Sequence, residues 1–110
     1  MNVTTATNDR FATVAPEGRL TAVGAPRVRQ AVQDLIDAGS VRIVVDMART
    51  EFVDSSGLGA LIGALKAARL AGGDLRIAAV PDAVRTVLRL TNLDRVLHAH
   101  PTAEAAFDAD

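Results

Sequence analysis

The 110-residue sequence contains no cysteine, tryptophan or tyrosine, and its only aromatic residues are three phenylalanines. Without cysteine the chain can form neither disulfides nor thiolate metal sites, and it has no cysteine nucleophile. With so few aromatic rings, its hydrophobic core must consist of valine, leucine, isoleucine and alanine. No basic stripe and no set of stacking aromatic residues indicates direct nucleic-acid binding.

Long hydrophobic runs are also missing. All apolar stretches are much shorter than the roughly 18 residues that a membrane-spanning helix requires. Residues 1–11 are polar and lack the apolar core of a signal peptide, so we expect a cytoplasmic protein without a membrane span. The length suits a single domain over residues 1–110. A content of 49% hydrophobic and 23% charged residues, with a net charge of −1, is typical of a globular fold.

The hydrophobic pattern predicts strands and helices in alternation. Short β-branched or alternating segments predict strands at residues 3–7, 11–15, 41–47, 74–80 and 96–97, with residues 51–54 as a short extended piece or loop. Apolar residues at helical spacing, with proline, glycine or asparagine at the ends, predict helices at residues 26–38, 55–71, 81–92 and 101–107. This order predicts an α/β fold in which a small mixed sheet of four to five strands packs with about four helices.

Three details refine these elements. Pro16 and Gly18 predict a bulge or an edge position after the second strand. The nearly continuous apolar segment 41–47 is typical of a central strand that is covered on both faces. In the strand predicted at residues 74–80, the alternation places Leu75, Ile77 and Ala79 on one face.

The segment EFVDSSGLGALIG, residues 51–63, stands out because a strand leads almost directly into a helix there. Asp54 and Ser55 are both residue types that cap helix N-termini, because their oxygens accept hydrogen bonds from amides of the first turn. Gly57 and Gly59 follow inside that turn, where glycine costs up to about 1 kcal/mol relative to alanine. Such a cost calls for compensation, and the two glycines would leave the backbone open to a bulky partner.

The same segment suits a phosphorylation switch and a docking surface. A phosphate on a helix N-terminal serine would be favoured by free amides and the helix dipole, and it would add about −1.5 to −2 charges. The neighbouring Asp54 would repel that charge. A face of small residues on the helix could admit a partner, or it could be covered by the protein's own fold; this face comprises Ala60, Gly63, Ala64 and Ala67.

Residues 41–77, VRIVVDMARTEFVDSSGLGALIGALKAARLAGGDLRI, resemble the signature of the STAS family. This family joins the cytoplasmic domains of sulfate transporters and the anti-sigma factor antagonists. The segments GRLTAVGAPRVRQAV at residues 18–32 and VPDAVRTVLRLTNLDRVLHAH at residues 80–100 extend the resemblance to about residues 10–107. The motif DSSGLG resembles that of the antagonist members.

The resemblance implies a regulatory function without enzymatic activity. Ser55 would be the phosphoacceptor, with Ser56 as the less favoured acceptor. An anti-sigma factor serine kinase would bind the unmodified protein and release its sigma factor, ATP on the kinase would phosphorylate Ser55, and a metal-dependent, PP2C-type phosphatase would reverse the modification. The protein itself would need no cofactor. The partner-binding residues implied are Thr21, Asp54, Ser55, Ser56, Gly57, Leu58 and Gly59.

Two other interpretations remain open at this stage. STAS modules also serve as constitutive subunits of lipid-transport ABC complexes or of sensory scaffolds, which need no phosphate turnover.

Thr21 departs from the family, which often has an acidic residue there in a Gly-x-Leu-Asp pattern. An exposed N-terminal edge strand could also pair two copies into a homodimer.

No pattern indicates a catalytic or metal site. The chain has neither a Gly-x-Ser-x-Gly nucleophile elbow nor a phosphate-binding P-loop. Gly57 and Gly59 lack the third glycine of a dinucleotide loop, because Ile62 takes its place. We expect His98 and His100, the two histidines of the chain, at a solvated strand end.

Overall fold

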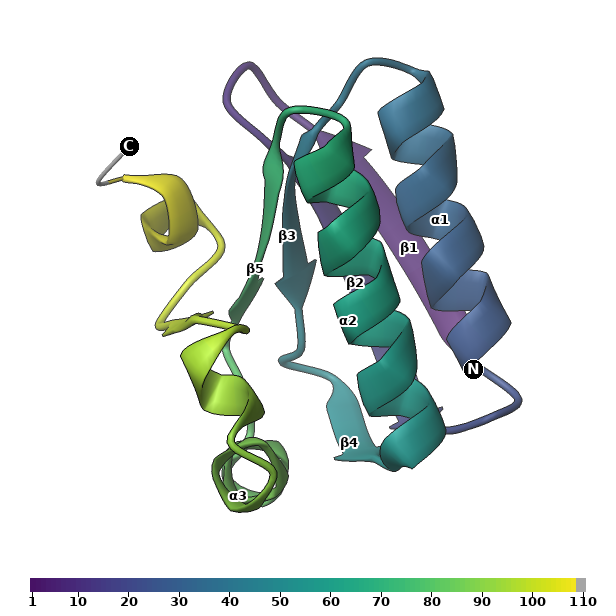
Figure 1. Ribbon diagram of the computed structural model, residues 1–110, viewed down its shortest axis with the longest axis vertical. Helices are drawn as coiled ribbons and strands as arrows, with labels where there is room; N and C mark the ends of the chain where they lie inside the picture. The colour runs from purple at the N-terminus through teal and green to yellow at the C-terminus, as the bar shows by residue number, and fades with distance from the viewer. Residues whose placement is uncertain (109–110) are drawn as a thin grey trace.

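Six strands form one mixed sheet in the computed structural model, which describes residues 1–108 (Figure 1). The strand order is β1-β2-β3-β5-β6, and β4 pairs with β2 beside this path. The strands are β1 (Asn2–Thr7), β2 (Ala12–Leu20), β3 (Arg42–Asp46), β4 (Thr50–Val53), β5 (Asp74–Ala78) and β6 (Ala99–His100). The helices are α1 (Ala25–Asp37), α2 (Ser55–Leu70) and α3 (Asp82–Leu90), with 3-10 turns at Leu93–Arg95 and Glu104–Phe107.

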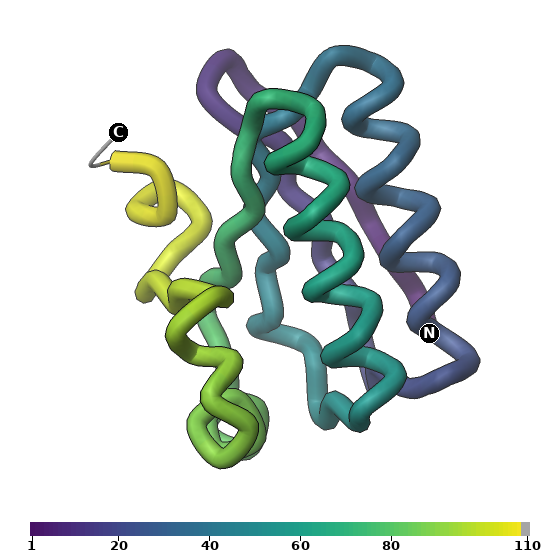
Figure 2. The backbone as a smooth tube through the Cα atoms, in the orientation of Figure 1, coloured from purple at the N-terminus to yellow at the C-terminus, as the bar shows by residue number. Residues whose placement is uncertain are grey.

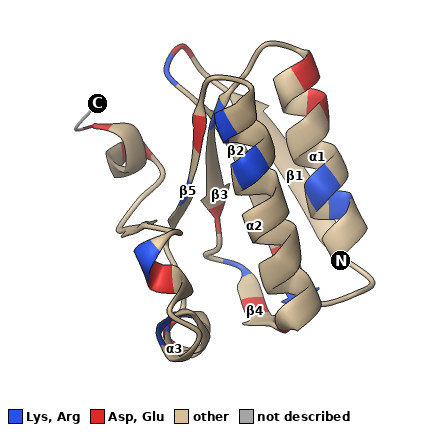
Figure 3. Cartoon of the chain, viewed as in Figure 1, with Lys and Arg blue, Asp and Glu red and all other residues tan. Residues whose placement is uncertain are grey.

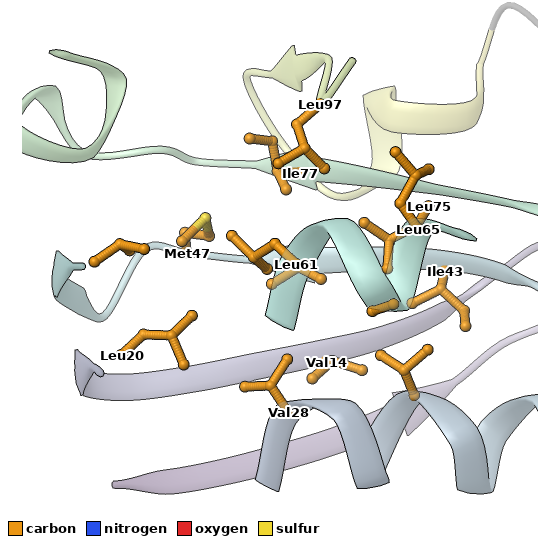
Figure 4. Close-up of a cluster of buried hydrophobic side chains, with 14 of the residues drawn as sticks. Val14, Leu20, Val28, Ile43, Met47, Leu61, Leu65, Leu75, Ile77 and Leu97 are labelled. Atoms are coloured by element: carbon orange, nitrogen blue, oxygen red, sulfur yellow. The ribbon is translucent and has the colours of Figure 1, made fainter. Parts of the chain in front are cut away.

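Helices α1 and α2 run side by side over one face of the sheet (Figures 1 and 2). Their apolar faces and the inward side chains of the central strands form the main core. Figure 4 shows Leu61 and Leu65 of α2 among side chains from the strands, including Ile43 and Leu75. All four of these side chains are buried. They are aliphatic, which agrees with the prediction that the core consists of valine, leucine, isoleucine and alanine.

The opposite face of the sheet carries a smaller core under the C-terminal 3-10 turn. Phe107 packs there with Phe11, Val44 and Ala78. The guanidinium of Arg76 lies 4.3 Å from the ring centroid of Phe107, and it donates a 2.8 Å hydrogen bond to the carbonyl of Ala106. The C-terminal segment is therefore held to the sheet through both its ring and its backbone.

Strand β2 bends near Gly18 and so serves two neighbours. Its first half pairs in parallel with β3, and its last residues pair in parallel with β4, with a register shift between Gly18 and Arg19. Gly18 has a φ of 99°, which glycine adopts at little cost. The buried hydroxyl of Thr50 donates a 3.0 Å hydrogen bond to the carbonyl of Pro16 and ties β4 to the bend. The bulge predicted around Pro16 and Gly18 is confirmed, but the predicted strand end at residue 15 is wrong, because β2 continues through the bulge to Leu20 and pairs there with β4.

The predicted element counts differ from the structure in two places. The sheet has six strands because residues 50–53 form a true strand, and the α-helices among the described residues number three. The segment from Pro101 to Phe107 makes only a 3-10 turn, since it is too short to support a regular helix. The central strand at residues 41–47 and the helices beginning near Pro26, Ser55 and Pro81 are confirmed.

The hydrophobic pattern also predicts the position of the last strand wrongly, at residues 96–97. The edge strand is Ala99–His100, because the amide of Leu97 closes the preceding turn on the carbonyl of Leu93 and its side chain enters the main core. Similarly, Ala79 does not continue the face of Leu75 and Ile77. Its φ of 52° turns the chain out of β5. No helix within residues 1–108 has the length and hydrophobicity that crossing a membrane requires.

Asp74 joins the end of α2 to the start of β5. Its carboxylate accepts hydrogen bonds from Arg69 Nε at 3.1 Å, from the amide of Leu75 at 2.9 Å and from Arg76 Nε at 3.3 Å. Burial by itself would raise the pKa of Asp74. The hydrogen bond from Arg69, those from Leu75 and Arg76, and the charge of Arg69 together lower this pKa below its usual value.

Replacing Asp74 by asparagine should therefore destabilise the protein in a pH-dependent manner. A carboxylate with a depressed folded-state pKa contributes stability above its unfolded pKa of about 3.9, and the contribution is lost as the pH falls through the folded-state pKa. Urea unfolding at pH 7, 5 and 3 should show the difference between wild type and Asp74→Asn shrinking at the lowest pH. Asp94→Asn, at an exposed carboxylate, is the control. A difference for Asp74→Asn that does not change with pH would contradict this assignment.

Candidate functional site

Asp54 alone separates β4 from α2, and it caps the helix. Its backbone is extended, and its Oδ1 accepts a 2.9 Å hydrogen bond from the amide of Gly57. Its carbonyl accepts from the amide of Leu58, also at 2.9 Å. Of the two capping residues that the sequence allowed, the structure selects Asp54. The hydroxyl of Ser55 is therefore not needed for this bond.

Ser55 and Ser56 are the first two residues of α2, and both are exposed. The amides of a helix's first turn have no acceptor within the helix, and the aligned peptide dipoles make this end electropositive. The two hydroxyls thus lie in solvent at a helix terminus that favours an added negative charge. Asp54 places one carboxylate directly beside them.

Gly57 is buried and has an internal role. A Cβ at this position would collide with the backbone carbonyl of Leu20 and would lie 2.9 Å from Cγ1 of Val53. Only glycine lets the first turn of α2 rest directly on the ends of β2 and β4. At Gly59, by contrast, a Cβ would meet no heavy atom within 4 Å, and the residue is exposed.

The predicted contact residues therefore divide into two groups. Leu58 is only 7% exposed and belongs to the main core, and Gly57 is enclosed by its neighbours. The expectation that both glycines leave the backbone open to a partner is wrong for Gly57. Ser55, Ser56 and Gly59 remain as the accessible residues of this turn.

Thr21 lies beside the cap because of the strand register. Leu20 pairs with Val53, and the amide of Asp54 donates to the carbonyl of Leu20 at 3.3 Å, so the residue after Leu20 follows alongside Asp54. Thr21 is half-buried, and its carbonyl accepts hydrogen bonds from the amides of Gly24 and Ala25 at the start of α1. The structure thus brings Thr21 to the start of α2 from a distant part of the sequence.

Two residues near this junction had no signal in the sequence. Val23, in the loop after Thr21, has a side chain that is 82% exposed. Arg19 places its guanidinium 4.6 Å from the ring centroid of Phe52, across the paired ends of β2 and β4. Neither exposure in a loop nor stacking between two strands can be read from hydrophobic periodicity, because both depend on the tertiary arrangement.

The small-residue face of α2 is partly internal. Ala60 and Ala64 are buried, while Gly63 is exposed and Ala67 is half-buried. The charged residues of α2 are Lys66 and Arg69, both in its C-terminal half, so the turns around the serines carry no charge of their own (Figure 3). The open strip of the helix surface therefore begins at the serines, is uncharged as far as Gly63, and continues to Lys66 and Arg69.

The two histidines do not assemble a metal site. His98 is exposed, and His100 is half-buried in β6 beside Ala78. Within residues 1–108, no three histidine, aspartate or glutamate side chains come together in a way that could hold a metal ion.

Comparison with known proteins assigns this fold and site to a family. The model of the STAS domain matches residues 2–106, and the chain belongs to this family. The anti-sigma-B factor antagonist of Staphylococcus aureus is 28% identical over 104 residues, covering 94% of this chain and 96% of that protein. The corresponding antagonist of Staphylococcus epidermidis is 27% identical over the same length.

Solved structures agree with this assignment. The crystal structure of an anti-sigma factor antagonist from Mycobacterium paratuberculosis superposes with a TM-score of 0.85 at 26% identity, covering 98% of this chain and 92% of that one. A Thermotoga maritima structure reaches a TM-score of 0.88, also at 26% identity, with coverage of 97% and 92%. The STAS fold therefore extends over essentially the whole chain, and the staphylococcal and mycobacterial relatives are named as antagonists.

The two glycines of the first turn should respond to alanine in opposite ways. Gly57→Ala should destabilise the protein by about 1–3 kcal/mol, because the new methyl group displaces the Leu20 backbone or the helix. Gly59→Ala should stabilise it by up to about 1 kcal/mol, because it enters open space and favours the helix. Chemical denaturation measures both. Equal effects of the two substitutions would show that α2 does not rest on Leu20 as described.

The cap can be tested at Asp54. Asp54→Ala should cost about 1 kcal/mol of unfolding free energy, because the amide of Gly57 loses its acceptor. Asp54→Asn should retain nearly full stability, since an amide oxygen also accepts this bond. Thermal and urea unfolding of both variants provide the measurement, and a loss of equal size in the asparagine variant would mean that the negative charge matters rather than the cap.

Proposed function

We propose that this protein is an anti-sigma factor antagonist whose binding to an anti-sigma factor serine kinase is controlled by phosphorylation of Ser55. The observation that carries the proposal is that capping and exposure fall on different residues at the start of α2. Asp54 makes the capping hydrogen bond, and Ser55 is exposed. The similarity to named antagonists along nearly the full chain supports the same function.

A phosphate on Ser55 would change the surface without disturbing the fold. The main-core residues nearest in sequence, Val53 and Leu58, are buried away from the solvent that Ser55 faces. The modification adds about −1.5 to −2 charges to an uncharged helix turn. The amides of Ser55 and Ser56 favour that charge, and the adjacent carboxylate of Asp54 opposes it, so the phosphate would extend outward toward a bound partner.

The contact surface follows from the accessible residues. It consists of Ser55, Ser56 and Gly59 on α2, the half-buried Asp54 before them, and Thr21 with the exposed Val23 on the loop after β2. Gly57 and Leu58 act indirectly, because they fix the position of the turn. An unmodified surface of this kind, whose one charge is the carboxylate of Asp54, suits close packing against a partner. Two additional negative charges at its centre would have to be desolvated on binding, which weakens the complex.

The cycle requires two partners and no cofactor on this chain. ATP bound to the kinase transfers its γ-phosphoryl group to the Ser55 hydroxyl, leaving ADP on the kinase and releasing the hydroxyl proton. A PP2C-type phosphatase hydrolyses the phosphoserine with water and restores the hydroxyl. The protein is thus a substrate and a binding partner, not an enzyme, and it works in the cytoplasm, where sigma factors and ATP are found.

Substitution of the two serines tests the acceptor. With the cognate kinase and ATP, Phos-tag electrophoresis should show one shifted species for wild type, none for Ser55→Ala, and an unimpaired shift for the matched control Ser56→Ala. Ser55→Ala should still bind the kinase, whereas Ser55→Asp should bind at least tenfold more weakly, a change of about 1.4 kcal/mol. Undiminished phosphorylation of Ser55→Ala would overturn the site assignment. Recovery of a transporter ATPase in place of a kinase would overturn the proposed partner.

A further inference from the structure

Strand β1 forms an edge of the sheet that is open to solvent. It pairs only with β2, and no other strand within residues 1–108 borders its outer side. All six of its residues pair with β2 in an unbroken antiparallel register from Asn2 to Thr7. The strand contains no charged residue and no proline, and its register has no bulge. Proteins commonly use charged residues, proline or a bulge to keep an edge strand from pairing with another chain, and β1 has none of the three.

The alternation of hydrogen bonds in an antiparallel pair shows which backbone groups face outward. The amide of Asn8 donates to the carbonyl of Phe11, so this pair is hydrogen-bonded. Counting back along the register, Ala6 and Thr4 also bond to β2, while Thr7, Thr5 and Val3 occupy non-bonded positions. The partner of Val3 is Pro16, which has no amide hydrogen to donate and so fits such a position. The amides and carbonyls of Val3, Thr5 and Thr7 therefore point away from the sheet.

We propose that β1 pairs with β1 of a second copy of this chain, antiparallel and with the two-fold axis at Thr5. In this register Thr5 faces its own counterpart, and Val3 faces Thr7 of the other copy on both sides. All three outward residues of each strand are then hydrogen-bonded, whereas a shift by one pair in either direction leaves at least one of them without a partner from the other strand. Two sheets join into one.

The side chains favour a second copy as the occupant. Because β1 is uncharged, the two-fold axis brings no like charges together within the strand pair. Val3 packs toward the main core and lines a groove with Arg27 and Ala31 of α1, and Thr7 of the second copy would lie against Val3 there. Cross-strand threonine pairs, such as Thr5 with its counterpart, are among those that stabilise sheets. The contact is smaller than a standard interface, so the dimer should be weak and reversible.

The proposal is independent of the function assigned to Ser55, because it uses no residue of that site. A dimer formed in this way would present two copies of the start of α2, each carrying one Ser55. The dimer would then offer a binding partner two docking surfaces on one particle.

Disulfide trapping tests the register, and the absence of natural cysteine makes each introduced thiol unique. In the proposed pair the two Thr5 Cα atoms are about 5.5 Å apart, within reach of a disulfide. Thr5→Cys should therefore form a covalent dimer under mild oxidation. Thr7→Cys is the matched control, since it lies on the same face but is separated from its counterpart by about 14 Å along the strand. Equal cross-linking of both variants would overturn the register.

A second measurement tests the dimer without cysteine. Sedimentation of the wild-type chain should show reversible, concentration-dependent dimerisation. Thr5→Pro should abolish it, because the substitution removes an outward amide that β2 does not use. Thr5→Lys should weaken it by placing like charges opposite one another. Unchanged circular dichroism would confirm that both variants fold. A wild-type chain that stays monomeric at every concentration, or a Thr5→Pro variant that still dimerises, would overturn the proposal.

Discussion

The contact between the start of α2 and the end of β2 is the constraint on which the rest of the site depends. Gly57 rests against the carbonyl of Leu20, and the same carbonyl accepts the amide of Asp54. These two interactions fix where β4 stops and where the helix begins. The positions of Thr21 and of the exposed Ser55 follow from them, because both residues are adjacent in sequence to the fixed groups.

The junction separates rigidity from accessibility. Asp54 and Gly57 hold the turn through a side-chain hydrogen bond and a backbone contact, and Leu58 anchors it in the core. The hydroxyls of Ser55 and Ser56 take no part in these stabilising contacts, and both residues are exposed. A covalent change at such a hydroxyl can alter binding while the scaffold keeps its shape, which is what a reversible signalling surface requires.

Much of the fold was predictable because hydrophobic periodicity and end signals act locally. The strand at residues 41–47 and the helices after Pro26 and before Gly72 are confirmed, since each has a strong pattern and clear terminators. The prediction failed where the pattern was short. An apolar pair such as Val96 and Leu97 fits a strand and a turn equally well. The turn forms because the side chain of Leu97 packs in the main core and its amide bonds to the carbonyl of Leu93.

The sequence alone determined the family resemblance, the order of the main elements and the serine at a strand-to-helix junction. These are properties of neighbouring residues, and local sterics and hydrogen bonding suffice to specify them. Only the tertiary structure decided that Asp54 rather than Ser55 caps the helix, that Gly57 is internal and Gly59 open, and that Thr21 lies beside Asp54. Those facts depend on the parallel pairing of β2 with β4, which joins segments more than thirty residues apart. No local pattern encodes a contact between two surfaces that meet only when the sheet has formed.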